Sequence, residues 1–438
     1  MNCKPTVLLL VFTRHFMWSR SDGQGGTTSF YYDDEITWLI AAAVLILIAW
    51  LVLKRFLRAR RLRRPPPPLD RKSLNQALRV KNELSRRYLR PGVSNRIHAV
   101  GLGKTEPGSF CVQIFLNDNP TEELWTGSGS ATPPAIYKGV PLELIEMPAA
   151  AFLEATLQSL PSNVTSGIRD RCEVITGGIS GANSNLRGQS GTIGYFCTRR
   201  SMIRRQKQIH LLSNSHVFAD LQKQSIDRQD LIMQPSPGEP GSNRPIASLI
   251  DYSALTFDDS DEPNHIDAAV AQLWDRQPHE PVIPFVGSVQ GYVQKTDVQI
   301  GERACKFGRT TGYSEGVVFS IYLDIWIHYD RTGRAAFFKD QFLIEPATDF
   351  TKFVDKGDSG SLVLDPAQHA IGLVFAGTAE IPPAVKEKQP GGPIAADNHA
   401  ATGRKRIEGY GVANPISEVL DRMKIDLVVA DKAVSPRL

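Results

Sequence analysis

Hydrophobic residues change their spacing several times along this chain, and the longest uninterrupted run predicts a membrane-spanning helix. Residues 36–53, ITWLIAAAVLILIAWLVL, carry no charge. As a helix they would rise about 27 Å, close to the thickness of a bilayer core. Trp38 and Trp50 lie near the ends of the run, which is typical of membrane helices rather than of buried core helices. We therefore expect a transmembrane helix over residues 36–53, after a short amino-terminal tail of residues 1–35.

The segment after this run is basic and then proline-rich. Seven Lys or Arg residues lie in residues 54–64, and four prolines follow at 65–68. Consecutive prolines favour an extended polyproline II conformation, so residues 54–72 predict a stalk. The basic residues can contact anionic lipid head groups, or they can serve only to set the topology of the helix. Because positive residues favour the cytoplasmic side, we expect a single-pass membrane protein with everything beyond the stalk in the cytoplasm.

Two further units are predicted from the spacing beyond the stalk. Residues 73–88 have helical spacing, and the β-prone pieces HAVGLG, FCVQIFL and VPLELIEM follow, so residues 73–150 predict a small α+β accessory unit. Residues 151–187 include a stretch rich in Gly, Ser and Asn and predict a connecting segment. Residues 188–428 alternate short β-prone segments with turn signals, which favours one or two β-barrels. Within them PISEVLDRMKIDLV has helical spacing, and residues 429–438 form a tail.

Composition and cysteine usage narrow the possible functions. The chain has 438 residues, 42% hydrophobic and 22% charged, which is typical of a folded protein with two or three units. A net charge of +4 is small for this length and does not suggest a nucleic-acid partner. The five cysteines have neither a CxxC pair nor metal-ligand spacing, which predicts no zinc site, and we expect no cofactor. They are Cys3, Cys111, Cys172, Cys197 and Cys305.

Three short strings in the β-rich unit carry the residue types of a nucleophilic triad, in the order His, Asp, Ser. LSNSHVFA contains His216, HIDAAVAQL contains Asp267, and KGDSGSLV contains Ser359. A serine hydroxyl becomes a strong nucleophile when an imidazole takes its proton, and the imidazole needs a carboxylate to fix its tautomer. The spacing alone also allows an ordinary Gly-rich turn at Ser359.

Other residues nearby compete for these roles. His210 lies within a β-prone stretch and is better explained as a packing or surface residue. His265 is two positions from Asp267, too close along a strand to share its hydrogen bond easily. Asp251 is a weaker acid candidate than Asp267, because no AAVAQL-like strand follows it.

The three strings together resemble the active-site motifs of trypsin-like serine peptidases of the chymotrypsin fold, over roughly residues 188–428. GDSGS is the most specific of them. KFGRTTGYSEGVV resembles the strand pair that opens the second barrel in members without a zymogen, and AIGLVFAGT resembles the strand that lines the substrate cleft. With the β-prone pieces of residues 97–147, the arrangement is similar to bacterial and plant narrow-leaf-type trypsin-like proteases. The resemblance implies a mainly β fold, a chymotrypsin-like double β-barrel.

The resemblance also implies a role for each site residue. His216 would be the general base and then the acid, Asp267 its orienting carboxylate, and Ser359 the nucleophile that forms an acyl-enzyme. The backbone N–H groups of Gly357 and Ser359 would form the oxyanion hole. The substrate would contact four residues, Phe353, Phe375, Ala376 and Gly377.

Several departures from the family pattern qualify these expectations. Phe353, at the expected base of the specificity pocket, argues against selection of Lys or Arg and favours small or medium apolar side chains. In secreted relatives the aspartate equivalent to Asp358 pairs with a newly cut amino terminus, but no activation site is evident here, so its partner is unassigned. Val217 replaces a common cysteine, so no disulfide is needed there. Residues 377–409 form a Pro- and Gly-rich insertion that could be a lid or a docking loop.

Two functions from different classes follow. The first is a membrane-anchored serine endopeptidase acting on a protein or peptide substrate. The alternative is a chymotrypsin-fold binding or scaffolding module that keeps the triad but has little or no turnover. The sequon NVT at residues 163–165 can be glycosylated only if this segment is exported, and it is better explained as a chance tripeptide in a polar loop.

Overall fold

The computed structural model divides the chain into two compact units, Met1–Arg61 and Leu62–Leu438. In the first unit, β1 (Ser19–Ser21) and β2 (Thr27–Ser29) form an antiparallel pair, and residues 42–50 are helical. The described residues are 19–21, 27–29, 42–50, 70–91, 97–105, 108–116, 134–147, 150–152, 169–186, 188–200, 208–223, 225–242, 244–329, 334–378, 405–406 and 409–430.

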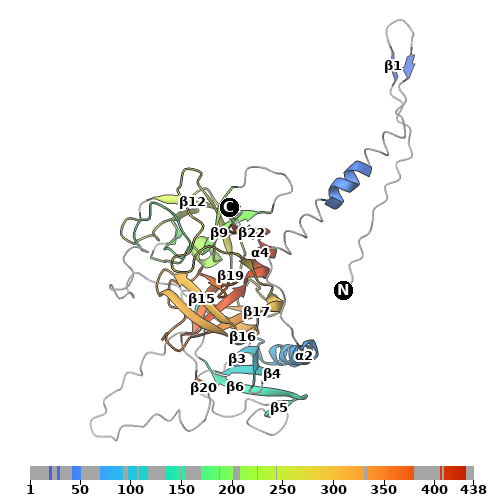
Figure 1. The fold of residues 1–438 in the computed structure, drawn as a ribbon, viewed down its shortest axis with the longest axis vertical. Coiled ribbons are helices and arrows are strands. Elements are labelled where there is room, and N and C mark those ends of the chain that lie inside the picture. Colours follow the sequence, from blue (N-terminus) through green and yellow to red (C-terminus); the bar gives the residue numbers. More distant parts are fainter. Residues whose placement is uncertain are drawn as a thin grey trace, which may run out of the picture. The chain divides into compact units, whose positions relative to one another are not determined.

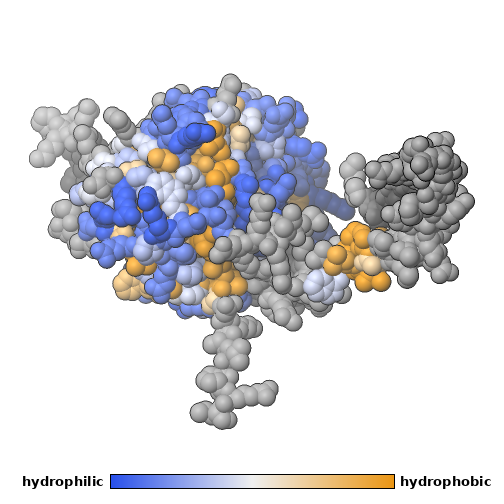
Figure 2. All heavy atoms as spheres, turned by 90° about the horizontal axis from the view of Figure 1, so that it is seen from above, coloured by the Kyte–Doolittle hydropathy of each residue, from blue (hydrophilic) through white to orange (hydrophobic). Residues whose placement is uncertain are grey.

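The helical residues 42–50 belong to the run expected to span a membrane. Their large apolar side chains are exposed, and the aliphatic ones are among the residues coloured orange in Figure 2. Residues 36–41 and 51–53, which complete the expected span, lie outside the described residues, as do residues 54–69 of the stalk. Within the described part of the chain, no helix combines the length and the hydropathy needed to cross a membrane.

The second unit contains two sheets, and the fold is mainly β. The first sheet has seven antiparallel strands, drawn mostly in green in Figure 1. Its core includes Ile193, Phe196 and Leu212, all fully buried. In sheet order the strands are β22 (Ile425–Leu427), β9 (Tyr195–Arg199), β10 (His210–Ser213), β13 (Ala269–Leu273), β12 (Pro245–Tyr252), β11 (Leu231–Met233) and β8 (Ala182–Asn183).

The second sheet contains a closed ring of six strands. β15 pairs with β18 at one end of the strand order and with β16 at the other, which closes the sheet on itself. Each strand of the ring therefore has a neighbour on both sides over part of its length. In order the strands are β15 (Arg303–Gly308), β18 (Leu362–Leu364), β19 (His369–Thr378), β21 (Gly411–Pro415), β17 (Arg334–Pro346) and β16 (Gly312–Tyr329).

The region expected to form a separate α+β unit is continuous with the second sheet. β3 pairs with the far part of β16, where Ile325 lies opposite Ala99, so the strands of this region extend the same sheet. Strands on both sides of the expected boundary at residue 150 therefore belong to one sheet. The strands of this region are β3 (Ile97–Lys104), β4 (Phe110–Leu116), β5 (Ile136–Tyr137) and β6 (Val140–Glu146). Two short strands join the same sheet, β7 (Ala150–Phe152) and, from much later in the chain, β20 (Lys405–Arg406).

Helix α2 (Arg71–Tyr88) packs on this extension, as the blue elements of Figure 1 show. Asp70 caps it by accepting hydrogen bonds from the backbone of Lys72 and Ser73, at 3.1 and 3.3 Å. Lys81 is fully buried on its apolar face and forms an ion pair with the buried Asp324 of β16. A buried charge is tolerated when it is paired in this way, so the pair fixes the helix to the sheet.

Two other segments differ from expectation. The first sheet begins before residue 188, because β8 at Ala182–Asn183 pairs with β11. The stretch PISEVLDRMKIDLV is only half helical: α4 (Ile416–Arg422) ends at a turn where Lys424 has φ +54°, and β22 then pairs with β9. Cross-strand pairing outweighs the helical spacing there. Of the 377–409 insertion, residues 379–404 and 407–408 lie outside the described residues, as does the sequon at 163–165.

Candidate functional site

The register of two strands brings His216 and Asp267 together. β10 and β13 pair so that Ser213 lies opposite Ala269. His216 follows Ser213 on the short helix α3 (Ser215–Phe218), and Asp267 precedes Ala269 by two residues. His216 Nδ1 is hydrogen-bonded to Asp267 Oδ2, with both side chains almost completely buried. The structure therefore places these two residues as a buried pair.

The Asp267 carboxylate is held by the backbone of α3. Its Oδ1 accepts hydrogen bonds from Ser215 N at 2.6 Å and His216 N at 3.3 Å. The Asn214 side chain donates to the Asp267 carbonyl at 2.7 Å. On the other side, Asp267 N donates to the buried side chain of Asn414 on β21, which ties the pair to the second sheet. These bonds restrict the carboxylate to one orientation against the imidazole.

Ser359 lies on a turn of the second sheet that fits tightly against the first. Its carbonyl accepts a hydrogen bond from Thr192 N at 2.8 Å, and Ser213 Oγ donates to the Thr192 carbonyl at 2.7 Å. Gly360 has φ +94°, and a Cβ there would come 2.2 Å from the Thr192 carbonyl oxygen. Only glycine fits this conformation and this gap. The turn is thereby held beside the end of the strand that leads to His216.

The Ser359 hydroxyl and two nearby amides are the groups that could carry chemistry. Ser359 is fully buried, and its Oγ donates to the Phe375 carbonyl at 3.2 Å. Gly357 has φ +99°, and its carbonyl accepts from Thr192 Oγ1 at 2.9 Å. Among the described residues, no acceptor is seen for the backbone N–H of Gly357 or of Ser359. Two such donors on one turn are what an oxyanion hole requires.

A buried ion pair shapes this turn, and it supplies the partner of Asp358 that the sequence left unassigned. Lys306 Nζ lies 3.0 Å from Asp358 Oδ2, with both side chains fully buried. The carboxylate also accepts from Thr310 N at 2.9 Å, from Thr311 N at 3.2 Å, from Thr311 Oγ1 at 2.8 Å and from Asp355 N at 2.9 Å. The turn is therefore organised by a lysine within the chain.

The charge state of Asp358 follows from these contacts. Burial by itself raises the pKa of the Asp358 carboxyl, but the Lys306 charge and the donated hydrogen bonds outweigh it and lower the pKa below its ordinary value. Because the folded pKa is the lower one, the pair contributes its full stability above about pH 4 and loses it as the pH falls through the folded pKa. Burial also lowers the pKa of Lys306, which the facing carboxylate partly offsets.

The expected substrate contacts lie on two segments. Phe353 is fully buried in the core of the second sheet, with its ring centroid 5.9 Å from Lys306 Nζ, so it packs beside the ion pair. Phe375, Ala376 and Gly377 lie together on β19. The Phe375 ring packs against Phe338 with centroids 4.6 Å apart. The Phe375 side chain is therefore part of the core, and its carbonyl is the group that contacts Ser359.

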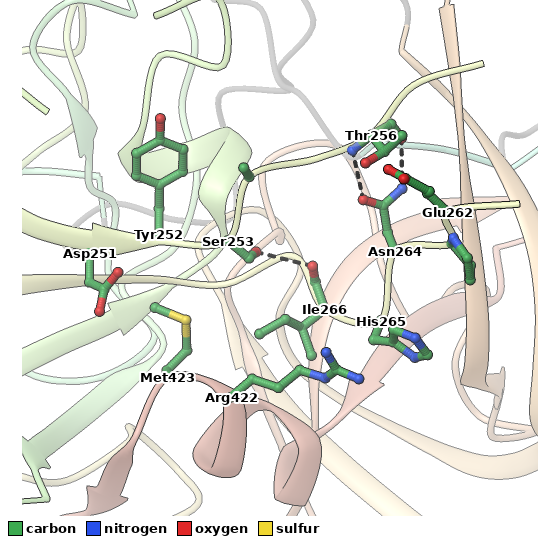
Figure 3. Close-up of a pocket in the computed structure, with 12 residues that line it drawn as sticks. Asp251, Tyr252, Ser253, Thr256, Glu262, Asn264, His265, Ile266, Arg422 and Met423 are labelled. Carbon is green, nitrogen blue, oxygen red and sulfur yellow. Dashed lines mark hydrogen bonds between the residues drawn. The ribbon is translucent and has the colours of Figure 1, made fainter. Parts of the chain in front are cut away.

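The competing residues lie elsewhere. A pocket of about 430 Å³ is lined in part by Asp251 and His265 and contains none of the three candidate triad residues (Figure 3). Asp251 forms an exposed ion pair with Arg199 at 2.8 Å. Burial, together with Arg422, lowers the pKa of His265. His210 is buried on β10, opposite Cys197 and Gln272.

Some residues that hold the site had no sequence signal. Lys306 and Thr192 fall in ordinary strand-like stretches, and their contacts link positions up to 165 residues apart. Arg309, whose amide donates to Thr192 Oγ1 at 3.1 Å, forms a buried ion pair with Glu239. Because side chains alternate along a strand, the apolar neighbours of Lys306 would place it on the polar face, and only the structure shows that it is buried against Asp358. In the described part of the chain, no cluster of His, Cys, Asp or Glu is arranged to hold a metal ion.

Comparison with known proteins gives weak relationships. No family model matches the chain. Protein NARROW LEAF 1 of rice (Oryza sativa subsp. japonica) is 24% identical over 268 residues, which cover 56% of this chain. The match spans 41% of the length of the rice protein. This level of identity does not establish membership of its family.

Several solved serine protease structures are similar to part of the chain. Protease A of Thermobifida fusca shares 15% identity over 59% of this chain and 100% of its own, with a TM-score of 0.35. The chymotrypsin of Cellulomonas bogoriensis shares 12% identity over 58% of this chain and 99% of its own, also at 0.35. The Nocardiopsis protease shares 16% identity over 58% of this chain and 98% of its own, with a TM-score of 0.34. These neighbours are chymotrypsin-type proteases, but such TM-scores do not establish a common fold.

The Lys306–Asp358 pair generates a stability prediction. We expect Lys306→Met to lower the free energy of unfolding by about 3–5 kcal/mol, because it leaves a buried carboxylate without its cation. Lys356→Met, at an exposed lysine near the same turn, should change it by less than about 0.5 kcal/mol. Urea denaturation measures both. The double variant Lys306→Met/Asp358→Asn should recover part of the loss, and equal stability of the Lys306→Met and Lys356→Met proteins would contradict this role of the pair.

Proposed function

We propose that this chain is a trypsin-like serine endopeptidase with a chymotrypsin-like double β-barrel. The supporting observation is the buried hydrogen bond between His216 Nδ1 and Asp267, because a carboxylate in that position keeps the other ring nitrogen available to accept a proton. The fit of the Ser359 turn against the strand that leads to His216 gives further support. The substrate is an extended segment of a protein or peptide.

In the proposed reaction Ser359 Oγ leaves the Phe375 carbonyl and attacks the scissile carbonyl carbon while His216 Nε2 takes its proton. The amides of Gly357 and Ser359 stabilise the oxyanion that forms. His216 then gives the proton to the departing amine, which leaves an acyl ester on Ser359. Water, activated by His216, hydrolyses this ester and regenerates the free hydroxyl. Asp267 stays ionised and stabilises the imidazolium in both steps.

The alternative, a binding or scaffolding module, is favoured by one observation. Ser359 is fully buried and its hydroxyl already has an acceptor in the Phe375 carbonyl, a state that by itself gives no turnover. Covalent labelling with a small fluorophosphonate separates the two functions. A folded protein that is never labelled at Ser359 would favour the module over the peptidase.

The triad generates a prediction on peptide hydrolysis. Ser359→Ala and His216→Ala should each lower kcat/KM by at least about 10⁴-fold, and the double variant should be no worse than either, because the residues act as one unit. Asp267→Asn should lose about 10⁴-fold, since an amide favours the wrong imidazole tautomer. Asp251→Asn is the matched control and should keep its activity. Additive losses, or a crippled Asp251→Asn enzyme, would show that the roles are wrongly assigned.

We propose further that residues 36–53 anchor the protein in a membrane and that the protease unit lies in the cytoplasm. The exposed apolar side chains of residues 42–50 and the basic residues 54–64 support this, and the basic residues are suited to anionic lipid head groups. In sealed cells or right-side-out vesicles, added protease should leave the chain beyond Pro68 intact until detergent opens the membrane. Digestion from the outside before that point would reverse the proposed orientation.

A further inference from the structure

The β19 segment expected to receive a substrate is paired on both of its edges. On one edge Ala376 lies opposite Val412 and Gly377 opposite Gly411, both on β21. On the other edge the same residues pair with β7, as Ala376 does with Phe152. A strand has two hydrogen-bonding edges, so a substrate that pairs with this segment as an added strand needs β7 to leave.

β7 runs along β19 toward the residue that contacts the Ser359 hydroxyl. β7 pairs antiparallel to β19, with Ala150 opposite Thr378 and Phe152 opposite Ala376. Its chain therefore runs toward Phe375, the residue whose carbonyl accepts the Ser359 hydroxyl. β7 thus leads toward the proposed nucleophile, as an extended peptide would if it were added to β19 as an antiparallel strand.

β7 is also held from its far side, but it is short. Ala151 lies opposite His328 of β16, in a parallel bridge, so β7 fills the space between two strands of the second sheet. It has three residues, and its pairing with β16 is this single bridge. A three-residue strand contributes few backbone hydrogen bonds, so it can be displaced without unfolding the six-stranded ring.

We propose that β7 is a built-in, substrate-like inhibitory strand that occupies the peptide-binding edge of β19 and must be displaced before a substrate binds. The proposal rests on the proposed peptidase function. Because β7 belongs to the same chain, it competes with a substrate at the high effective concentration of a tethered segment. An extended peptide, or a partner that draws the 150–152 segment away, would shift the population toward the open form.

Two covalent probes with different requirements test this. A small fluorophosphonate reports on the Ser359 nucleophile, whereas a tripeptidyl phosphonate ester must also pair with β19. Ala151→Pro removes one backbone N–H from β7 and should weaken its pairing. The labelling rate of the tripeptidyl probe should therefore increase, and by a factor about ten times larger than the increase for the small probe. Tenfold is the effect expected for one lost backbone hydrogen bond. Ala151 is paired on both sides, so its N–H faces a strand whichever way it points. Ala155→Pro, three residues past β7, is the matched control.

The outcomes separate the two proposals. If both probes label wild type and Ala151→Pro at the same rates, β7 is not inhibitory and the peptidase function stands. If neither probe labels any folded variant at Ser359, the peptidase function fails and the inhibitory role fails with it. A synthetic peptide of residues 148–154, added to the Ala151→Pro protein, should slow labelling by the tripeptidyl probe again. If the peptide does not change that rate, the inference is also contradicted.

A measurement on the unaltered chain covers the case in which the proline variant does not fold. Amide hydrogen exchange of residues 150–152 should be protected in the wild-type protein. Protection of residues 150–152 should fall when the tripeptidyl phosphonate is bound to Ser359. It should be unchanged when the small fluorophosphonate is bound to Ser359. Unchanged protection with the tripeptidyl group bound would overturn the inhibitory role.

Discussion

The buried contact between Lys306 and Asp358 is the constraint on which the candidate active site depends. Asp358 accepts hydrogen bonds from the Lys306 ammonium and from the segment 310–311, so the residues on either side of it have little freedom. Gly357 and Gly360 then take positive φ values, which aims the turn at the first sheet. A carboxylate buried without its cation would cost several kcal/mol, so the turn and the ion pair form together.

The rest of the site follows from how the two sheets meet at this turn. Thr192, three residues before β9 of the first sheet, contacts both sides of the turn: its amide donates to the Ser359 carbonyl and its hydroxyl donates to the Gly357 carbonyl. The register of β10 and β13 sets the His216–Asp267 pair independently, and Asn414 joins that pair to the second sheet. β19 then lines the same region, with β7 on its edge. We therefore expect a substitution in either sheet to alter the position of Ser359 or of the His216–Asp267 pair through the contacts of Thr192 and Asn414.

Local sequence was informative wherever the chemistry lies in short strings. The histidine and aspartate motifs led to two residues that are hydrogen-bonded to each other, and the serine motif led to a turn. The β-prone pieces of residues 97–147 coincide closely with β3, β4 and β6. Long-range pairing was not predictable from such strings. Lys306 as the partner of Asp358, the fusion of β3 with β16, and the position of β7 all depend on contacts between distant segments.

The mass of the labelled chain is the most direct test of whether a lysine within the chain, rather than a cut amino terminus, makes the nucleophile competent. The full-length protein would be incubated with fluorophosphonate to completion and analysed by intact-mass spectrometry and peptide mapping. We expect one adduct per chain, on Ser359, in protein whose mass shows no prior cleavage. An adduct found only on cleaved chains, or no adduct on folded protein, would contradict this explanation of the site.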